Sequence, residues 1–96
     1  MPIDDGTAIS YTALPTGVPV YDAAEVEVGT LRKVLDNARE RIFDGIEVER
    51  RDRVVVFVDA PEVARTAERG VTLNITGAEL DAYPAAKGGV RRLFGR

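Results

Sequence analysis

The chain contains no cysteine, no histidine and no tryptophan among its 96 residues. Without cysteine it can form no disulfide, no thiolate nucleophile and no cysteine zinc site. Without histidine it lacks the side chain that most often serves as a general base and as a neutral metal ligand. These absences exclude most familiar catalytic arrangements, the Ser-His-Asp triad included. We therefore expect a protein that is not an enzyme and that uses no cofactor.

Long hydrophobic runs are also missing. No apolar stretch approaches the roughly 18–20 residues that a membrane-spanning helix needs. The segment Met1–Gly6 carries two aspartates and lacks the apolar core of a secretory signal. We therefore expect a cytoplasmic protein without a transmembrane segment.

Acidic side chains outnumber basic ones, and the two signs are unevenly distributed. The chain has 16 Asp+Glu and 13 Lys+Arg, a net charge of −3. Residues 84–96 hold four basic residues and no acidic one, so residues 1–83 carry a net charge of −7. Because an acidic body repels nucleic acid, we do not expect nucleic acid as a partner. We divide the chain into a flexible N-terminus (1–8), one folded domain (9–83) and a basic flexible tail (84–96).

Short β-prone segments separated by turn residues follow one another along the chain. Arg53–Val58 is continuous and β-branched, and Val71–Ile75 alternates between apolar and polar positions. Pro61 suits the first position of a short helical turn, and Thr76 with Glu79 has the spacing of a capping box. The pattern predicts a mostly β chain, a small antiparallel β-barrel with one or two short helical turns.

The stretch Thr30–Phe43 allows two interpretations. Its apolar residues recur at the spacing of a helical stripe, with Thr30 as a possible N-cap. The alternative is a strand through Val28–Asp36, followed by a turn at Asn37–Arg41. The residue pattern alone favours the helix.

Four short motifs follow one another along the chain: Gly17–Asp22, Val28-Gly29, Phe43–Ile46 and Phe57–Ala60. In their order and spacing they resemble the PRC-barrel domain family, most of all its small stand-alone actinobacterial members. The resemblance covers residues 9 to about 75. One departure is visible: the family usually has an Asp-Gly turn before the Val-Gly strand, and this chain has Ala24–Glu27 there.

The resemblance implies a strand over Val28–Leu35 and a hairpin across Ala64–Val71, and we adopt both. It also implies a non-enzymatic binding or scaffold role, with a protein as the partner. Because a related barrel occurs in the ribosome maturation factor, the alternative is a ribosome- or RNA-associated accessory protein. The strand pattern predicts a core of Val20, Val28, Leu31, Phe43, Ile46, Val54, Val56, Val58, Val71 and Leu73.

Few polar residues suggest chemistry. The paired carboxylates at Asp4-Asp5, Glu25/Glu27 and Glu47/Glu49 have no further ligands beside them, so we interpret them as solvated and predict no metal site. Ser10 lacks a nucleophile elbow. The turn Arg50–Arg53 is basic, but the acidic residues around it favour ion pairs within the chain.

The two ends of the chain carry the interaction hypotheses. Ile9–Leu14 is β-prone and lies outside the barrel motifs, so it could extend a neighbour's sheet in a homodimer or cover its own. In the tail, a helical turn would separate apolar from cationic side chains and suit an acidic groove or an anionic membrane. The alternative to a tail that binds a partner is a tail that only aids solubility, or one that folds back on the acidic residues 1–83. The residues predicted to bind a partner are Lys87, Arg91, Arg92, Leu93, Phe94 and Arg96.

Overall fold

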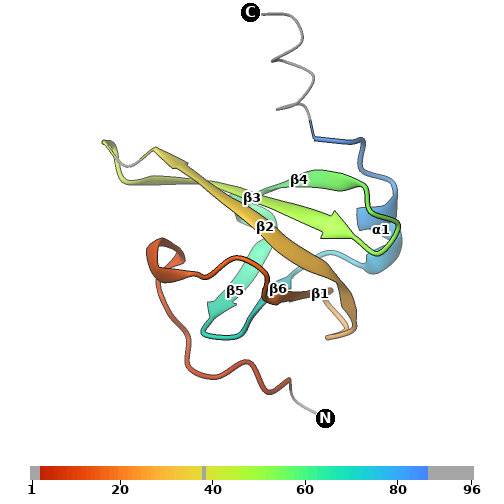
Figure 1. Cartoon of the computed structure of the whole chain (residues 1–96), viewed down its shortest axis with the longest axis horizontal. Coiled ribbons are helices and arrows are strands. Elements are labelled where there is room, and N and C mark those ends of the chain that lie inside the picture. Colours follow the sequence, from red (N-terminus) through yellow and green to blue (C-terminus); the bar gives the residue numbers. More distant parts are fainter. Residues whose placement is uncertain (1–2, 38, 87–96) are drawn as a thin grey trace, which may run out of the picture.

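Six strands form one sheet that folds over on itself (Figure 1), in a computed structural model that describes residues 3–37 and 39–86. The strands are β1 (Pro19–Tyr21), β2 (Glu27–Asn37), β3 (Ile42–Arg50), β4 (Val55–Asp59), β5 (Val63–Ala67) and β6 (Gly70–Leu73). Two 3₁₀ turns, η1 (Tyr11–Ala13) and η2 (Ala60–Glu62), and one short helix, α1 (Gly77–Asp81), complete the chain. The expectation of a mostly β domain with short helical turns is confirmed.

The sheet is mixed, in the order β4-β3-β2-β1-β6-β5. All neighbours are antiparallel except β1 and β6, which run parallel. The expectation of a closed antiparallel barrel is therefore not confirmed. Among the described residues β4 and β5 remain the two edges, and each is partly covered by a single bridge, Val56 with Ala85 and Ala67 with Ala8.

The segment that allowed two interpretations is a strand, so its helical pattern was misleading. A β-bulge between Leu31 and Lys33 explains the pattern. The extra residue shifts the alternation, so Leu31 and Val34, three residues apart, both face the core. An apolar pair at a spacing of three is then compatible with a bulged strand as well as with a helix. The strand over Val28–Leu35 and the hairpin across Ala64–Val71 are both confirmed.

The core lies between the two halves of the folded sheet. Seven of the ten residues predicted for it are fully buried: Val20, Leu31, Ile46, Val56, Val58, Val71 and Leu73. The other three, Val28, Phe43 and Val54, are half-buried and pack against its margin. The prediction missed Leu14, Val48, Ile75 and Leu80, which are also buried in it. Ile75 and Leu80 reach the core because α1 covers one end of the sheet.

The turn between β1 and β2 shows what replaces the Asp-Gly turn. Asp22 is buried, and its carboxylate accepts hydrogen bonds from the backbone N–H groups of Ala24, Val26 and Gly77. Because Gly77 opens α1, one side chain shapes the turn and also fixes the helix to it. The predicted capping box of Thr76 and Glu79 is present.

None of the helices formed by residues 3–37 and 39–86 is long and apolar enough to cross a membrane.

Candidate interaction site

The largest concentration of arginines in the described chain lies at the turn between β3 and β4. We call Arg50, Arg51, Asp52 and Arg53 the arginine turn. It closes tightly, because Arg50 N–H donates to Val54 O and Arg53 N–H donates to Arg50 O, both at 2.9 Å. Arg53 has a positive φ of 74°, which the tight turn imposes. The arginine turn is therefore a tight backbone turn at the end of a hairpin.

Arg50 is used for structure. Its side chain is only 10% exposed, and Nη1 donates to the backbone carbonyls of Leu80, Asp81 and Tyr83. Its Nε and Nη2 form a bidentate pair with the carboxylate of Asp52. The hydrogen bonds to this guanidinium lower the pKa of the Asp52 carboxyl. Arg50 thereby ties the end of α1 to the arginine turn and has few donors left for a ligand.

We predict that Arg50→Ala lowers the melting temperature clearly, because the carbonyls of Leu80, Asp81 and Tyr83 each lose one hydrogen bond. Arg53→Ala is the matched control, since the Arg53 side chain is 87% exposed and makes only a 3.6 Å ion pair with Glu49. Circular dichroism melting of both variants measures the difference. Equal melting temperatures would contradict a structural role for Arg50.

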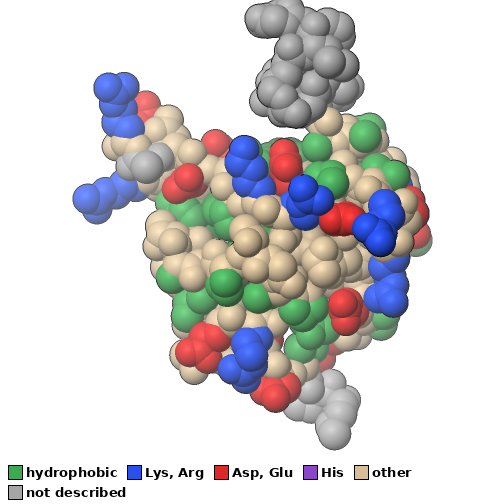
Figure 2. Space-filling model, viewed as in Figure 1, with side chains coloured by type: hydrophobic (Ala, Val, Ile, Leu, Met, Phe, Trp, Pro, Cys, Tyr) green, Lys and Arg blue, Asp and Glu red, His purple; other side chains and the backbone are tan. Residues whose placement is uncertain are grey.

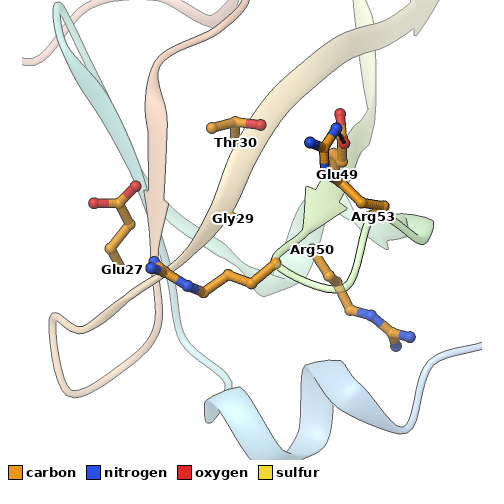
Figure 3. A pocket seen from close by; sticks show the side chains of 7 residues that line it. Glu27, Gly29, Thr30, Glu49, Arg50 and Arg53 are labelled. Carbon is orange, nitrogen blue, oxygen red and sulfur yellow. Dashed lines mark ion pairs between the residues drawn. The ribbon is translucent and has the colours of Figure 1, made fainter.

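Two adjoining hollows flank the arginine turn. One, of about 450 Å³, lies between the turn and the start of β2, with Glu27 on the opposite wall from Glu49 and Arg53 (Figure 3). The other, of about 340 Å³, lies between the turn and α1 and is lined by Val28, Arg51, Asp52, Gly77 and Asp81. Arg51 lines both hollows. We call the two hollows together the turn groove.

Most charged side chains of the turn groove pair with one another, but two acids and one base do not. Glu49 pairs with Arg32 at 2.9 Å and with Arg53 at 3.6 Å. Arg50 is neutralised by Asp52. Arg51, Glu27 and Asp81 form no ion pair with any residue that the structure describes, and all three are exposed. The groove therefore presents one basic and two acidic groups that form no ion pair.

The chain passes close to the arginine turn again near its end. Ala85 bridges to Val56, and Ala86 N–H donates to Val55 O at 2.7 Å. Ala86, the last described residue, is thus hydrogen-bonded to Val55, which follows Arg53 by two residues. The first three residues of the expected tail, Pro84–Ala86, line the edge of β4. The residues predicted to bind a partner, Lys87, Arg91, Arg92, Leu93, Phe94 and Arg96, lie outside the described residues.

Tyr83 anchors this last part of the chain. Its hydroxyl donates to Glu62 Oε1 of η2 at 2.6 Å. Burial, then the hydrogen bond to Glu62 and that group's charge, raise the pKa of Tyr83 to about 12. The contact joins two segments that are 21 residues apart. It holds the start of the C-terminal segment against the sheet.

We predict that the absorbance titration of the tyrosines at alkaline pH contains one late step, near pH 12, that Tyr83→Phe removes. Since the folded pKa lies above the ordinary value of 10.0, the contact stabilises fully below pH 10 and is lost as the pH rises through 12. Glu62→Gln removes the facing charge and should move the step to lower pH. A Tyr83 step that stays in place in Glu62→Gln would show that burial alone raises this pKa.

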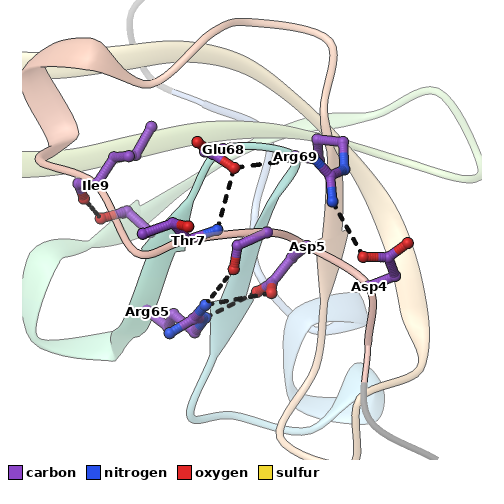
Figure 4. A network of polar contacts seen from close by, with 9 residues as sticks. Asp4, Asp5, Thr7, Ile9, Arg65, Glu68 and Arg69 are labelled. Carbon is purple, nitrogen blue, oxygen red and sulfur yellow. Dashed lines mark hydrogen bonds and ion pairs between the residues drawn. The ribbon is translucent and has the colours of Figure 1, made fainter.

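The remaining polar candidates have structural roles. Ser10 accepts from Thr12 N–H and caps η1. Asp4 and Asp5 pair with Arg69 and Arg65 (Figure 4). In residues 3–37 and 39–86 no three acidic side chains come together in a way that could hold a metal ion. Every buried side-chain oxygen or nitrogen of these residues has a hydrogen-bond partner.

No protein-family model matches the chain, and no curated protein is significantly similar to it.

The sequence analysis expected ion pairs within the arginine turn, and these are present for Asp52 with Arg50 and for Glu49 with Arg53. It did not foresee the turn groove or the place of Glu27 in it. The missing information was the register of β2 on β3, which sets Gly29 opposite Arg50 and Thr30 opposite Glu49. In the long hairpin of β2 and β3, the residues that face each other can be identified only when the position of the bulge is known, because the bulge shifts the register.

Proposed function

We propose that the chain is a non-enzymatic, PRC-barrel-like module that binds an acidic segment of a partner protein. The partner lies in the turn groove and is held by Arg51 together with the basic residues of the tail. The observation that carries this proposal is the hydrogen bond of Ala86 to Val55, which starts the tail beside the arginine turn. In this proposal Arg51 and the cations of the tail bind the same partner.

The proposed membership in the PRC-barrel family is supported by the succession of strands. The motifs that resemble the family fall on β1, on β2, on β3 and on β4 with η2, in the expected order. The open, mixed sheet described above limits this support to the order of the elements. The scaffold role is supported by the structural use of Arg50, Ser10, Asp5 and Asp22.

The alternative, association with RNA or the ribosome, is less well supported. On the face that Figure 2 shows, basic and acidic side chains lie interspersed and form no broad basic patch. The net charge of residues 1–83 is −7. The stacked aromatic pair joins Tyr11 of η1 to Phe43 of β3, with ring centroids 4.6 Å apart, so each ring already has one face covered by the other. Recognition of single-stranded RNA needs free aromatic faces within a basic groove.

Fluorescence anisotropy tests the proposal on the full chain. The probes are a labelled 12-residue peptide of alternating glutamate and leucine and a labelled oligouridylate. We expect the peptide to bind with a salt-sensitive affinity and the oligouridylate to bind at least tenfold more weakly. Stronger binding of oligouridylate would replace the proposal by the RNA alternative, and no binding of either probe would overturn both.

Two matched variants locate the peptide site. Arg51→Glu should weaken peptide binding several-fold, because it reverses the one base of the groove that forms no ion pair among the described residues. Arg39→Glu reverses an exposed charge at the tip of the long hairpin and should leave binding unchanged. A chain ending at Ala86 should lose most of the affinity and keep its melting temperature. Equal loss in both charge variants would assign the binding to net charge alone.

A further inference from the structure

The N-terminal segment covers the free edge of β5 in the way a bound strand would (Figure 4). Ile9 N–H donates to Thr66 O, Glu68 N–H donates to Thr7 O, and Arg69 N–H donates to Asp5 O, all at 2.9 to 3.0 Å. Ala8 bridges to Ala67 in an antiparallel sense. Residues 5–9 therefore act as a partial seventh strand, which pairs with backbone groups of an edge that would otherwise be open.

Side chains of β5 and of the following turn recognise the two consecutive aspartates of this segment. Arg65 binds the carboxylate of Asp5 through Nε at 2.8 Å and through Nη2 at 3.3 Å, and it also donates to Gly6 O. Arg69 binds Asp4 at 3.0 Å. Asp5 is only 7% exposed, and the hydrogen bond from Arg65 lowers the pKa of its carboxyl. Because Asp5 is buried and Arg65 binds it through two nitrogens, Asp5 is the contact that gives this segment its specificity for β5.

The contacts are mostly of a kind that water can replace, so the segment can separate without exposing much of the core. They are backbone hydrogen bonds and ion pairs, and Ile9 is the one residue among 4–9 that packs against the core. Ser10–Gly17 then connects the segment to β1. Because Leu14 of this connection is buried in the core, the change of chain direction falls between Ile9 and Leu14, where η1 contains no buried residue.

We propose that the β5 edge is a docking site for the acidic N-terminal segment of a second copy of this chain, so that two copies exchange residues 3–9. Each contact named above then forms between copies instead of within one. The closed single chain prevails at low concentration, because the short connection gives its own segment an effective concentration of about millimolar. The exchange yields a symmetric dimer, since the segment and the edge belong to the same chain.

A charge-reversal pair tests the exchange on the full chain. Asp5→Arg alone sets two cations against each other within one copy, and Arg65→Asp alone sets two anions against each other. A mixture of the two variants restores both opposite-charge pairs only if the segments are exchanged. We expect light scattering to give about one chain mass for each variant alone and about two for the mixture. A mixture that stays at one chain mass, or a single variant that dimerises by itself, would overturn the proposal.

Two further measurements keep the test decisive if a variant fails to fold. The double variant, Asp5→Arg with Arg65→Asp, restores the pair within one copy and should give one chain mass with a melting temperature near that of the natural chain. For the unmodified chain, a mixture of ¹³C-labelled and unlabelled copies at about millimolar concentration should show isotope-filtered NOEs between Ile9 and Thr66. Their absence overturns the exchange whatever the variants do.

Discussion

Replacing Val56 by aspartate is expected to abolish folding. Val56 is fully buried in β4, opposite Val48 of β3 on one side and bridged to Ala85 on the other. A carboxylate there has no basic partner within the apolar cluster of buried residues. Burying it, or protonating it to avoid the charge, costs several kcal/mol, against a total stability of about 5–15 kcal/mol for a domain of this kind.

Val55→Asp is the matched control for this prediction. Val55 is the neighbouring valine of the same strand, but it points away from the core and is half-buried on the other face. The two variants add the same group to the same strand and differ only in the side of the sheet. Far-ultraviolet circular dichroism should show a β spectrum for Val55→Asp and an unfolded one for Val56→Asp. A folded Val56→Asp chain would contradict the placement of the core.

Replacing Gly45 by alanine is expected to destabilise the fold by roughly 2–5 kcal/mol, which combines backbone strain with overpacking. Gly45 lies in β3 with a φ of 153°, a conformation that side chains rarely adopt. An added Cβ would overlap the carbonyl oxygen of Val58 and would lie 2.8 Å from the ring of Phe57. Neither neighbour can move freely, because both belong to the paired strand β4.

Gly17→Ala separates the two causes. Gly17 also has a positive φ, 89°, but nothing lies within 4 Å of the position that a Cβ would take. It should therefore show only the cost of the conformation, about 1 kcal/mol. Urea unfolding of both variants measures the difference in the free energy of unfolding. A loss in Gly45→Ala no larger than in Gly17→Ala would show that the contact with β4 is not tight.

The sequence pattern was most informative where a segment is short and alternates regularly. Val71–Ile75 was placed correctly because every second residue faces one side of a strand. In the continuous apolar run around β4, Val56 and Val58 are buried as predicted, whereas Val54 is only half-buried. It was least informative in β2, where a bulge puts Leu31 and Val34 on the same face and so imitates a helix. In the same way Leu80 was missed, because one buried residue of a five-residue helix gives no periodic signal.

The sequence by itself determined the absence of thiol and imidazole chemistry, the mostly β character, the turns and most of the core. These properties follow from residue type and from neighbours along the chain. Only the tertiary structure decided that β1 pairs in parallel with β6, that Arg50 holds the end of α1 and that Arg65 binds Asp5. These contacts join residues 30 to 60 positions apart. Their formation depends on how the whole sheet folds over its core, because no local propensity selects one distant partner among many.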